Sequence, residues 1–174
     1  MNAFKKLSTI VGWMVFAIAV VTHYLVAKDL KGIWKSSEFI AGTNKVEVVP
    51  PSSNPLFAPN GQVLHYISEL LSNHPEDVIF LINILSGLSS ALAAMLVCWG
   101  TIIIGRLFFV GRDALPDRVK GIALLAAGAI AGLAVAFSSP IWFSAVAGEV
   151  YIMSIFFPCL IFWLGVKWYA LPNA

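Results

Sequence analysis

Four long stretches of apolar residues constrain this chain more than any other feature of its sequence. A helix that crosses a bilayer needs about 20 mostly apolar residues. Four segments reach or approach that length, and we expect spans at about 7–27, 78–105, 121–137 and 150–166. Charged residues make up 11% of the chain, against about 25% in a soluble domain. The sequence therefore predicts an all-α integral membrane protein with a single membrane domain over residues 1–174.

Composition also excludes several function classes. A chain with so few charged residues cannot cover a water-facing globule, which argues against a typical soluble enzyme. Its net charge of +2 is too small for the basic surface that nucleic-acid binding requires. We therefore expect membrane lipid as a partner and no nucleic acid.

Three of the predicted spans carry features that shape a helix. The second has no charged residue for 28 positions, which is longer than one straight crossing and predicts tilt or protrusion. The third should end near Phe137, because the triplet 138–140 is Ser-Ser-Pro and proline disfavours a helix before it. Pro158 lies inside the fourth span and predicts a kink there.

Basic residues indicate how the spans are oriented. Short cytoplasmic loops of membrane proteins are enriched in Lys and Arg. The clusters fall on one side of the membrane if both termini are cytoplasmic: Lys5 and Lys6, then Arg106, Arg112, Arg118 and Lys120, then Lys167. We therefore expect cytoplasmic N- and C-termini, with the loop 28–77 and the link 140–149 on the outer side.

The outer loop 28–77 is too long to be a simple connector, since loops above about 12–15 residues are usually functional or disordered. Within it, apolar residues recur at helical spacing over 61–72, which predicts short amphipathic structure at the membrane surface or against the spans. A role in packing alone would give the same pattern. His65 and His74 have no partners at metal-ligand spacing, so we expect neither a metal site nor a cofactor.

Small and polar residues inside the spans suggest helix contacts. Gly128 and Gly132 form a small-xxx-small pair that lets helix backbones approach, although the partner helix could belong to this chain or to another. Asn83 should face a helix or an aqueous cavity, because a lone amide in lipid is costly. Glu149, beside Tyr151, fits an interface residue or a residue that lines a cleft, and the sequence leaves both open.

Five segments together resemble the N-terminal part of a bacterial multi-spanning family of protein O-mannosyltransferase type, within the GT-C glycosyltransferase superfamily. Residues 34–41 are similar to its W-D-x-G-E-F-I-A motif, and residues 46–57 to its L-E-V-x-H-P-P-G-x-P-L-F motif. Residues 142–151 are similar to its W-F-S-A-V-x-G-E-V-Y motif. Residues 10–18 and 83–91 resemble its first two spans. The resemblance implies a location in the bacterial cytoplasmic (inner) membrane.

The resemblance also implies a mechanism, and the chain departs from it. In that superfamily an acid in the first outer loop takes a proton from the acceptor while the sugar leaves a polyprenyl-phosphate carrier. A general base must be unprotonated near pH 7, but the matching position holds Lys35, a cation. Ser37 replaces the motif glycine, whereas Glu38 is retained. The chain is also shorter than the family's enzymes, so we expect a shortened relative.

Three functions compete on these grounds. The first is a non-catalytic subunit or scaffold that works with other membrane protein chains, with no catalytic residue. The second is an active or split O-glycosyltransferase that binds a polyprenyl-phosphate sugar and uses Glu38 as base. A small transporter is the third, and the lack of ionisable residues in the spans disfavours it. In the first two, an outer cleft would contain Trp34, Lys35, Glu38, Glu47, Glu149 and Tyr151.

Overall fold

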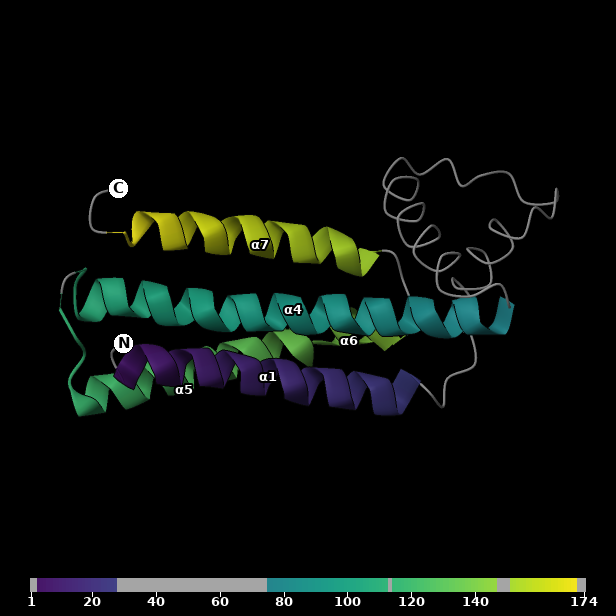
Figure 1. Ribbon diagram of the computed structural model, residues 1–174, viewed down its shortest axis with the longest axis horizontal. Coiled ribbons are helices and arrows are strands. Elements are labelled where there is room, and N and C mark those ends of the chain that lie inside the picture. Colours follow the sequence, from purple (N-terminus) through teal and green to yellow (C-terminus); the bar gives the residue numbers. More distant parts are fainter. Residues whose placement is uncertain (1–2, 28–74, 113, 147–150, 172–174) are drawn as a thin grey trace. The chain divides into compact units, whose positions relative to one another are not determined.

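All regular structure in the described part of the chain is α-helical (Figure 1). The computed structural model describes residues 3–27, 75–112, 114–146 and 151–171. The helices within these ranges are α1 (Ala3–Ala27), α4 (Pro75–Phe109), α5 (Arg118–Ala136), α6 (Ser139–Val146) and α7 (Tyr151–Tyr169).

Three of these helices are long and apolar enough to cross a membrane: Ala3–Val26, Ile84–Phe109 and Arg118–Ala136. The segment Ser154–Tyr169 is also apolar but shorter. Large apolar side chains are exposed on the helices, as lipid contact requires, with Met14, Phe108, Ile130 and Phe162 among them. The predicted all-α membrane class is confirmed. The division into four spans stays a prediction.

Helix α4 is longer than one crossing of a bilayer needs. Its 35 residues extend about 50 Å at 1.5 Å per residue, whereas the hydrocarbon core is about 30 Å thick. Asn83 lies in its first half, with only its backbone described. A helix of this length must tilt strongly or project beyond the lipid core.

The break between α5 and α6 falls where the Ser-Ser-Pro triplet predicted a helix end. At the start of α5, the Asp117 carboxylate accepts a hydrogen bond from the backbone N–H of Lys120 at 2.7 Å. At its end, Phe137 caps the helix. The following residues form α6, a short helix that was expected only as an outer link. Pro140 fits there because the first turn of a helix does not use its backbone N–H groups.

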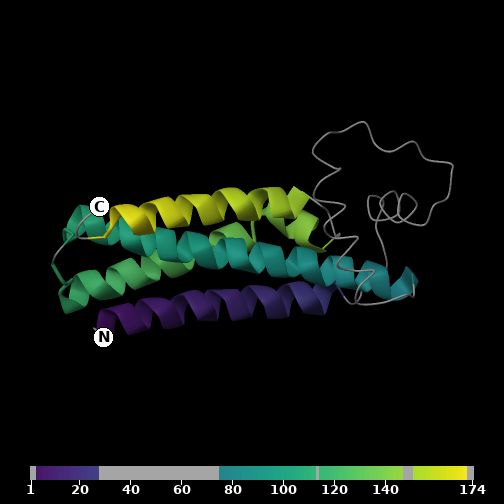
Figure 2. The same ribbon diagram turned by 45° about the horizontal axis from the view of Figure 1, so that its top comes forward.

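The chain divides into two compact units. Unit 1 comprises Met1–Ala19, Ala91–Ser138 and Phe156–Ala174, and unit 2 comprises Val20–Ser90 and Ser139–Ile155. Within unit 1, the portions of α1 and α5 run away from the two chain termini, and the portions of α4 and α7 run towards them (Figures 1 and 2).

Glycines of α5 set how closely the helices of unit 1 pack. A Cβ atom added to Gly132 would lie 2.8 Å from the backbone oxygen of Ala94 in α4. One turn earlier, a Cβ on Gly128 would lie 2.9 Å from the backbone oxygen of Cys98. Backbone atoms cannot move aside as the end of a side chain can, so the absence of side chains brings α5 directly against α4. The partner helix is therefore part of this chain.

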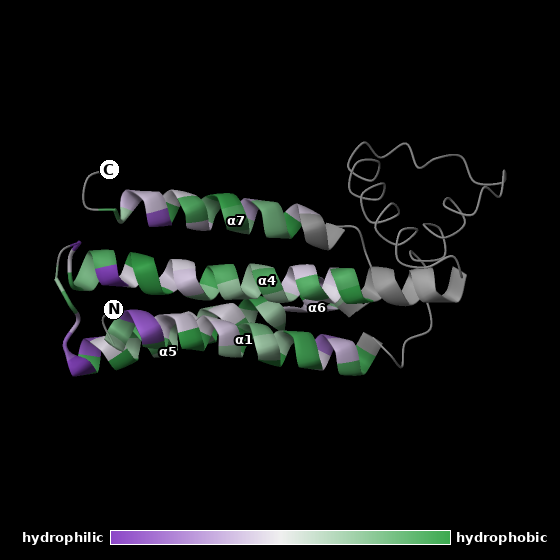
Figure 3. Cartoon of the chain, in the orientation of Figure 1, coloured by the Kyte–Doolittle hydropathy of each residue, from purple (hydrophilic) through white to green (hydrophobic). Residues whose placement is uncertain are grey.

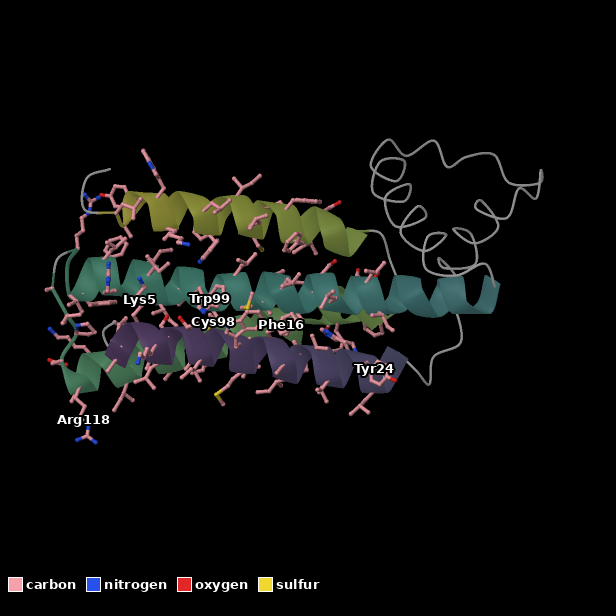
Figure 4. All side chains as sticks on the ribbon, in the orientation of Figure 1. Lys5, Phe16, Tyr24, Cys98, Trp99 and Arg118 are labelled. Carbon is pink, nitrogen blue, oxygen red and sulfur yellow. The ribbon has the colours of Figure 1, made fainter. Side chains whose placement is uncertain are left out.

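Trp99 joins α4 to α1 in the same unit. Its indole N–H donates a hydrogen bond to the backbone oxygen of Ser8 at 3.1 Å, and its ring lies over Gly12, where a Cβ would clash with it. Trp13 meets Trp99 edge-on at 6.2 Å, and Trp163 of α7 lies 5.8 Å away. Trp99, which lies beside α1 in Figure 4, therefore contacts both α1 and α7 from its place on α4.

Charged residues gather at one end of unit 1, which we call the basic end (Figure 3). Lys5 and Arg118, from α1 and α5, both lie there (Figure 4). The link after α4 turns at Gly111, whose φ of +102° suits glycine. Beyond this turn, Arg112 donates a hydrogen bond to the backbone oxygen of Tyr169 at 2.6 Å. The basic end thus ties the α4–α5 link to the end of α7.

Candidate functional site

The predicted outer cleft lies almost wholly outside the described residues. This holds for Trp34, Lys35, Glu38, Glu47 and Glu149, and also for the predicted amphipathic segment 61–72. Tyr151 begins α7, but only its backbone is described. The cleft and its residues therefore stay a prediction.

Unit 2 holds a polar group of residues inside an apolar helical body, which we call the buried polar cluster. It consists of His23, Ser86, Ser89 and Ser90, all of them buried. His23 is 1% exposed, and Ser86 and Ser90 have no exposed surface. Polar side chains are expensive within a membrane and mark functional sites more often than chance.

His23 lies close to α4 because the residue opposite it has no side chain. A Cβ on Gly87 would lie 3.2 Å from the Cβ of His23, closer than ordinary van der Waals contact. Trp142 of α6 covers the imidazole from another side, with ring centroids 5.1 Å apart and planes inclined at 50°. Helices α1, α4 and α6 thus each contribute one residue to this contact.

The serines of α4 differ in how their hydroxyl groups are used. Ser89 donates to the backbone oxygen of Leu85, one turn back, at 2.8 Å, a common arrangement for serine in a helix. The hydroxyls of Ser86 and Ser90 have no hydrogen-bond partner among the described residues. These two residues are one turn apart, so they share one side of α4, and Gly87, which meets His23, follows Ser86 in the sequence.

The chemistry that this cluster offers is hydrogen bonding. Serine hydroxyls donate and accept, and an imidazole offers two nitrogens. The described residues contain no group of three His, Cys, Asp or Glu side chains that could hold a metal ion.

Sequence reasoning missed the buried polar cluster, although a signal was present. His23 lies within a segment expected to span the membrane, and an intramembrane histidine is a functional candidate by default. Ser86 and Ser90 recur at a spacing of four, which places them on one helix face. The approach of α1 to α4 at Gly87 depends on packing between distant segments and has no local signal.

The helices and the buried polar cluster define a multi-pass α-helical membrane protein with a polar interior region. The family model for the Protein O-mannosyl-transferase TMEM260 N-terminal domain matches residues 35–174. The chain therefore belongs to the family of this N-terminal domain, and the expected relation to protein O-mannosyltransferases is confirmed at that level. Comparisons with curated proteins and with solved structures gave no match.

The family match covers part of each structural unit. It includes the expected motif residues from Lys35 to Glu149 and, in unit 2, the serines of the buried polar cluster and Trp142. His23 precedes the matched range. The histidine is therefore a candidate that comes from the structure rather than from the family match.

Proposed function

We propose that this chain is a non-catalytic membrane subunit or scaffold derived from a GT-C glycosyltransferase of the bacterial inner membrane. The observation that carries the proposal is Lys35, which stands where the motif W-D-x-G-E-F-I-A has its acid. An aspartate at that position could accept the proton of an acceptor hydroxyl. A protonated lysine cannot accept one, and its charge opposes the build-up of positive charge on a base.

Helix packing gives the proposal a second support. The contacts at Gly128 and Gly132 bring α5 against the backbone of α4, and Trp99 joins α4 to α1. These contacts build a defined helical body, which a subunit of a larger complex needs.

Restoring the acid tests this proposal directly. The full chain would be purified with its co-purifying partners and assayed for sugar transfer from a polyprenyl-phosphate-linked mannose, the sugar in the family's name. We expect no transfer by the wild type. Lys35→Asp should raise transfer by about 100-fold over background, the lower end of what a general base contributes. Lys35→Asn, which removes the charge without adding a base, is the matched control.

Active transfer by the unaltered chain would refute the scaffold and support a second function, an active or split O-glycosyltransferase. Glu38 is the candidate base in that case, since it keeps its place in the motif. Glu38→Gln would then abolish transfer, because the amide cannot accept the proton. Glu69→Gln removes an equal charge from the same loop, outside the expected cleft, and should leave transfer largely intact. A stable complex in which the unaltered chain gives no transfer supports the scaffold.

We further propose that the basic end faces the cytoplasm. Its Lys and Arg residues come from all three clusters that predicted the orientation of the chain. Reporter proteins that work on only one side of the membrane would be fused to the C-terminus. A fluorescent cytoplasmic reporter should be active there and a periplasmic phosphatase inactive. The reverse result would mean that the basic end faces the periplasm.

A further inference from the structure

An open apolar groove runs between the ends of α4 and α7, within unit 1. Its volume is about 530 Å³, in the range of small-molecule sites. Its walls include Ile104, Leu107 and Phe108 from α4 and Phe162, Gly165 and Tyr169 from α7. The α7 wall extends over about 10 Å at 1.5 Å per residue, compared with about 15 Å for one leaflet of the hydrocarbon core.

Two arginines lie near Tyr169, which is one of the residues that line the groove. Arg112 donates to the backbone oxygen of Tyr169 at 2.6 Å, and its guanidinium carbon lies 4.8 Å from the centre of the Tyr169 ring. Arg106, in the last turn of α4, reaches the backbone oxygen of Arg112 at 3.5 Å. Tyr169 itself lines the groove. Tyr169 therefore connects the apolar groove to the two arginines.

Charge at this end is strongly one-sided. The sequence of unit 1 contains seven basic residues and two acidic ones, Asp113 and Asp117, an excess of five positive charges. Asp117 already caps α5. A ligand that places negative charge beside Arg112 and Arg106 would offset part of this excess.

We propose that the groove binds one acyl chain of an anionic glycerophospholipid, whose phosphate pairs with Arg112 and Arg106. A chain in the groove leaves one apolar environment for another, so the apolar contact adds shape selection but little affinity. Phosphatidylcholine also carries a phosphate, but its choline ammonium cancels that charge, so the preference for the anionic lipid comes from its net negative charge beside the two arginines.

A second copy of this chain fits the groove less well. Two copies in one membrane, oriented alike, place their basic ends in the same leaflet. Bringing two such ends together at the groove would oppose like charges across the interface. A phospholipid instead supplies both an apolar chain and the missing negative charge.

Gly165 provides a way to fill the groove without disturbing the helix packing. A Cβ at this position would meet nothing within 4 Å, in contrast to Gly128 and Gly132. Leucine at position 165 would therefore project into the space that the acyl chain occupies. Alanine at the same position adds one carbon and serves as the matched control.

The experiment is a lipid titration of the purified full chain followed by native mass spectrometry. Phosphatidylglycerol and phosphatidylcholine with identical acyl chains are added separately in a non-ionic detergent. We expect one phosphatidylglycerol to bind more tightly than any phosphatidylcholine. Gly165→Leu should weaken the binding of both lipids, because its side chain excludes the acyl chain from the groove, and Gly165→Ala should retain the binding.

Charge variants test the head-group contact. Arg112→Gln should weaken phosphatidylglycerol binding about fivefold, which corresponds to about 1 kcal/mol for one basic residue near a lipid surface. Arg112→Lys keeps the charge and should retain most of the preference even if the end of α7 shifts. Arg118→Gln removes an equal charge at the start of α5, outside the groove walls, and should have no effect.

Four results would overturn the proposal. Equal binding of the two lipids would remove the preference for an anionic head group. An equal loss in Arg118→Gln would reduce the effect to general surface charge. A groove filled by Gly165→Leu with unchanged lipid binding, or a dimer that this substitution makes monomeric, would assign the groove to something other than a phospholipid.

Discussion

Small residues have different roles in the two units of this protein. In unit 1, Gly128 and Gly132 bring a helix against a neighbouring backbone, and the indole N–H of Trp99 has its acceptor. In unit 2, Gly87 makes room for a histidine. Beside it, the buried hydroxyls of Ser86 and Ser90 have no hydrogen-bond partner among the described residues.

Close helix packing is therefore found in unit 1, and buried polar groups are found in unit 2. Close helix contacts in a membrane come from small residues and need no polar groups, and unit 1 follows this pattern. Polar side chains can add hydrogen bonds to such packing, but a buried hydroxyl without a partner carries a cost in an apolar interior. We therefore expect unit 1 to carry the stability of the fold and unit 2 to carry any ligand chemistry that remains.

The largest effect should come from adding volume to the closest contact in unit 1. Gly132→Leu forces a side chain against the backbone oxygen of Ala94, and overpacking of this kind lowers stability by about 3 kcal/mol. The free energy of unfolding in detergent would be measured by denaturant titration. Ala127→Leu places the same side chain on an exposed position of α5.

The control variant should change stability by less than 0.5 kcal/mol or so, as exposed substitutions usually do. An equally stable Gly132→Leu protein would mean that α4 and α5 separate without loss. The expectation that unit 1 carries the stability of the fold would then be wrong.

The fold class could be predicted because hydropathy is a local property of the sequence. Segments without charge, such as 78–105, can be recognised one by one. The helix end before Pro140 was likewise visible, because proline acts on its immediate neighbours. The short helix α6 was missed, since a helix of eight residues depends on tertiary contacts more than on its own sequence.

The partners of these helices could not be predicted. The pattern of Gly128 and Gly132 indicates a close approach, but nothing in the sequence names Ala94 as the contact. Trp99 and Ser8 are 91 positions apart, and only the packing of α4 on α1 brings them together. The same reason hid the polar cluster around His23, while the outer cleft stays a prediction made from motifs.

A smaller effect should follow from removing one hydrogen bond of unit 1. Trp99→Phe keeps an aromatic ring beside Gly12 but loses the indole donor to Ser8. We expect a loss of about 1 kcal/mol, because the Ser8 carbonyl keeps its bond within the helix. Unfolding in detergent provides the measurement.

Trp168→Phe is the matched control, since Trp168 lies exposed on α7. It should leave the free energy of unfolding nearly unchanged. If both substitutions have the same effect, the indole bond between α4 and α1 contributes nothing to unit 1, and its stability rests on the glycine contacts alone.

The smallest effect should have the opposite sign and occur in unit 2. Ser90→Ala removes a buried hydroxyl that no described residue satisfies, so we expect a gain of about 0.5 kcal/mol in the free energy of unfolding. The gain is modest because the unfolded helices stay within the membrane, where the hydroxyl is also shielded from water.

Ser89→Ala is the control from the same helix, and it should reduce stability slightly, because Ser89 already donates to the Leu85 carbonyl. Opposite signs at these adjacent positions would show that Ser90 is retained at a cost, as expected for a residue that binds a ligand. A clear loss in Ser90→Ala would instead mean that a partner outside the described residues satisfies the hydroxyl. Unit 2 would then be stabilised by polar contacts, just as unit 1 is by its glycines.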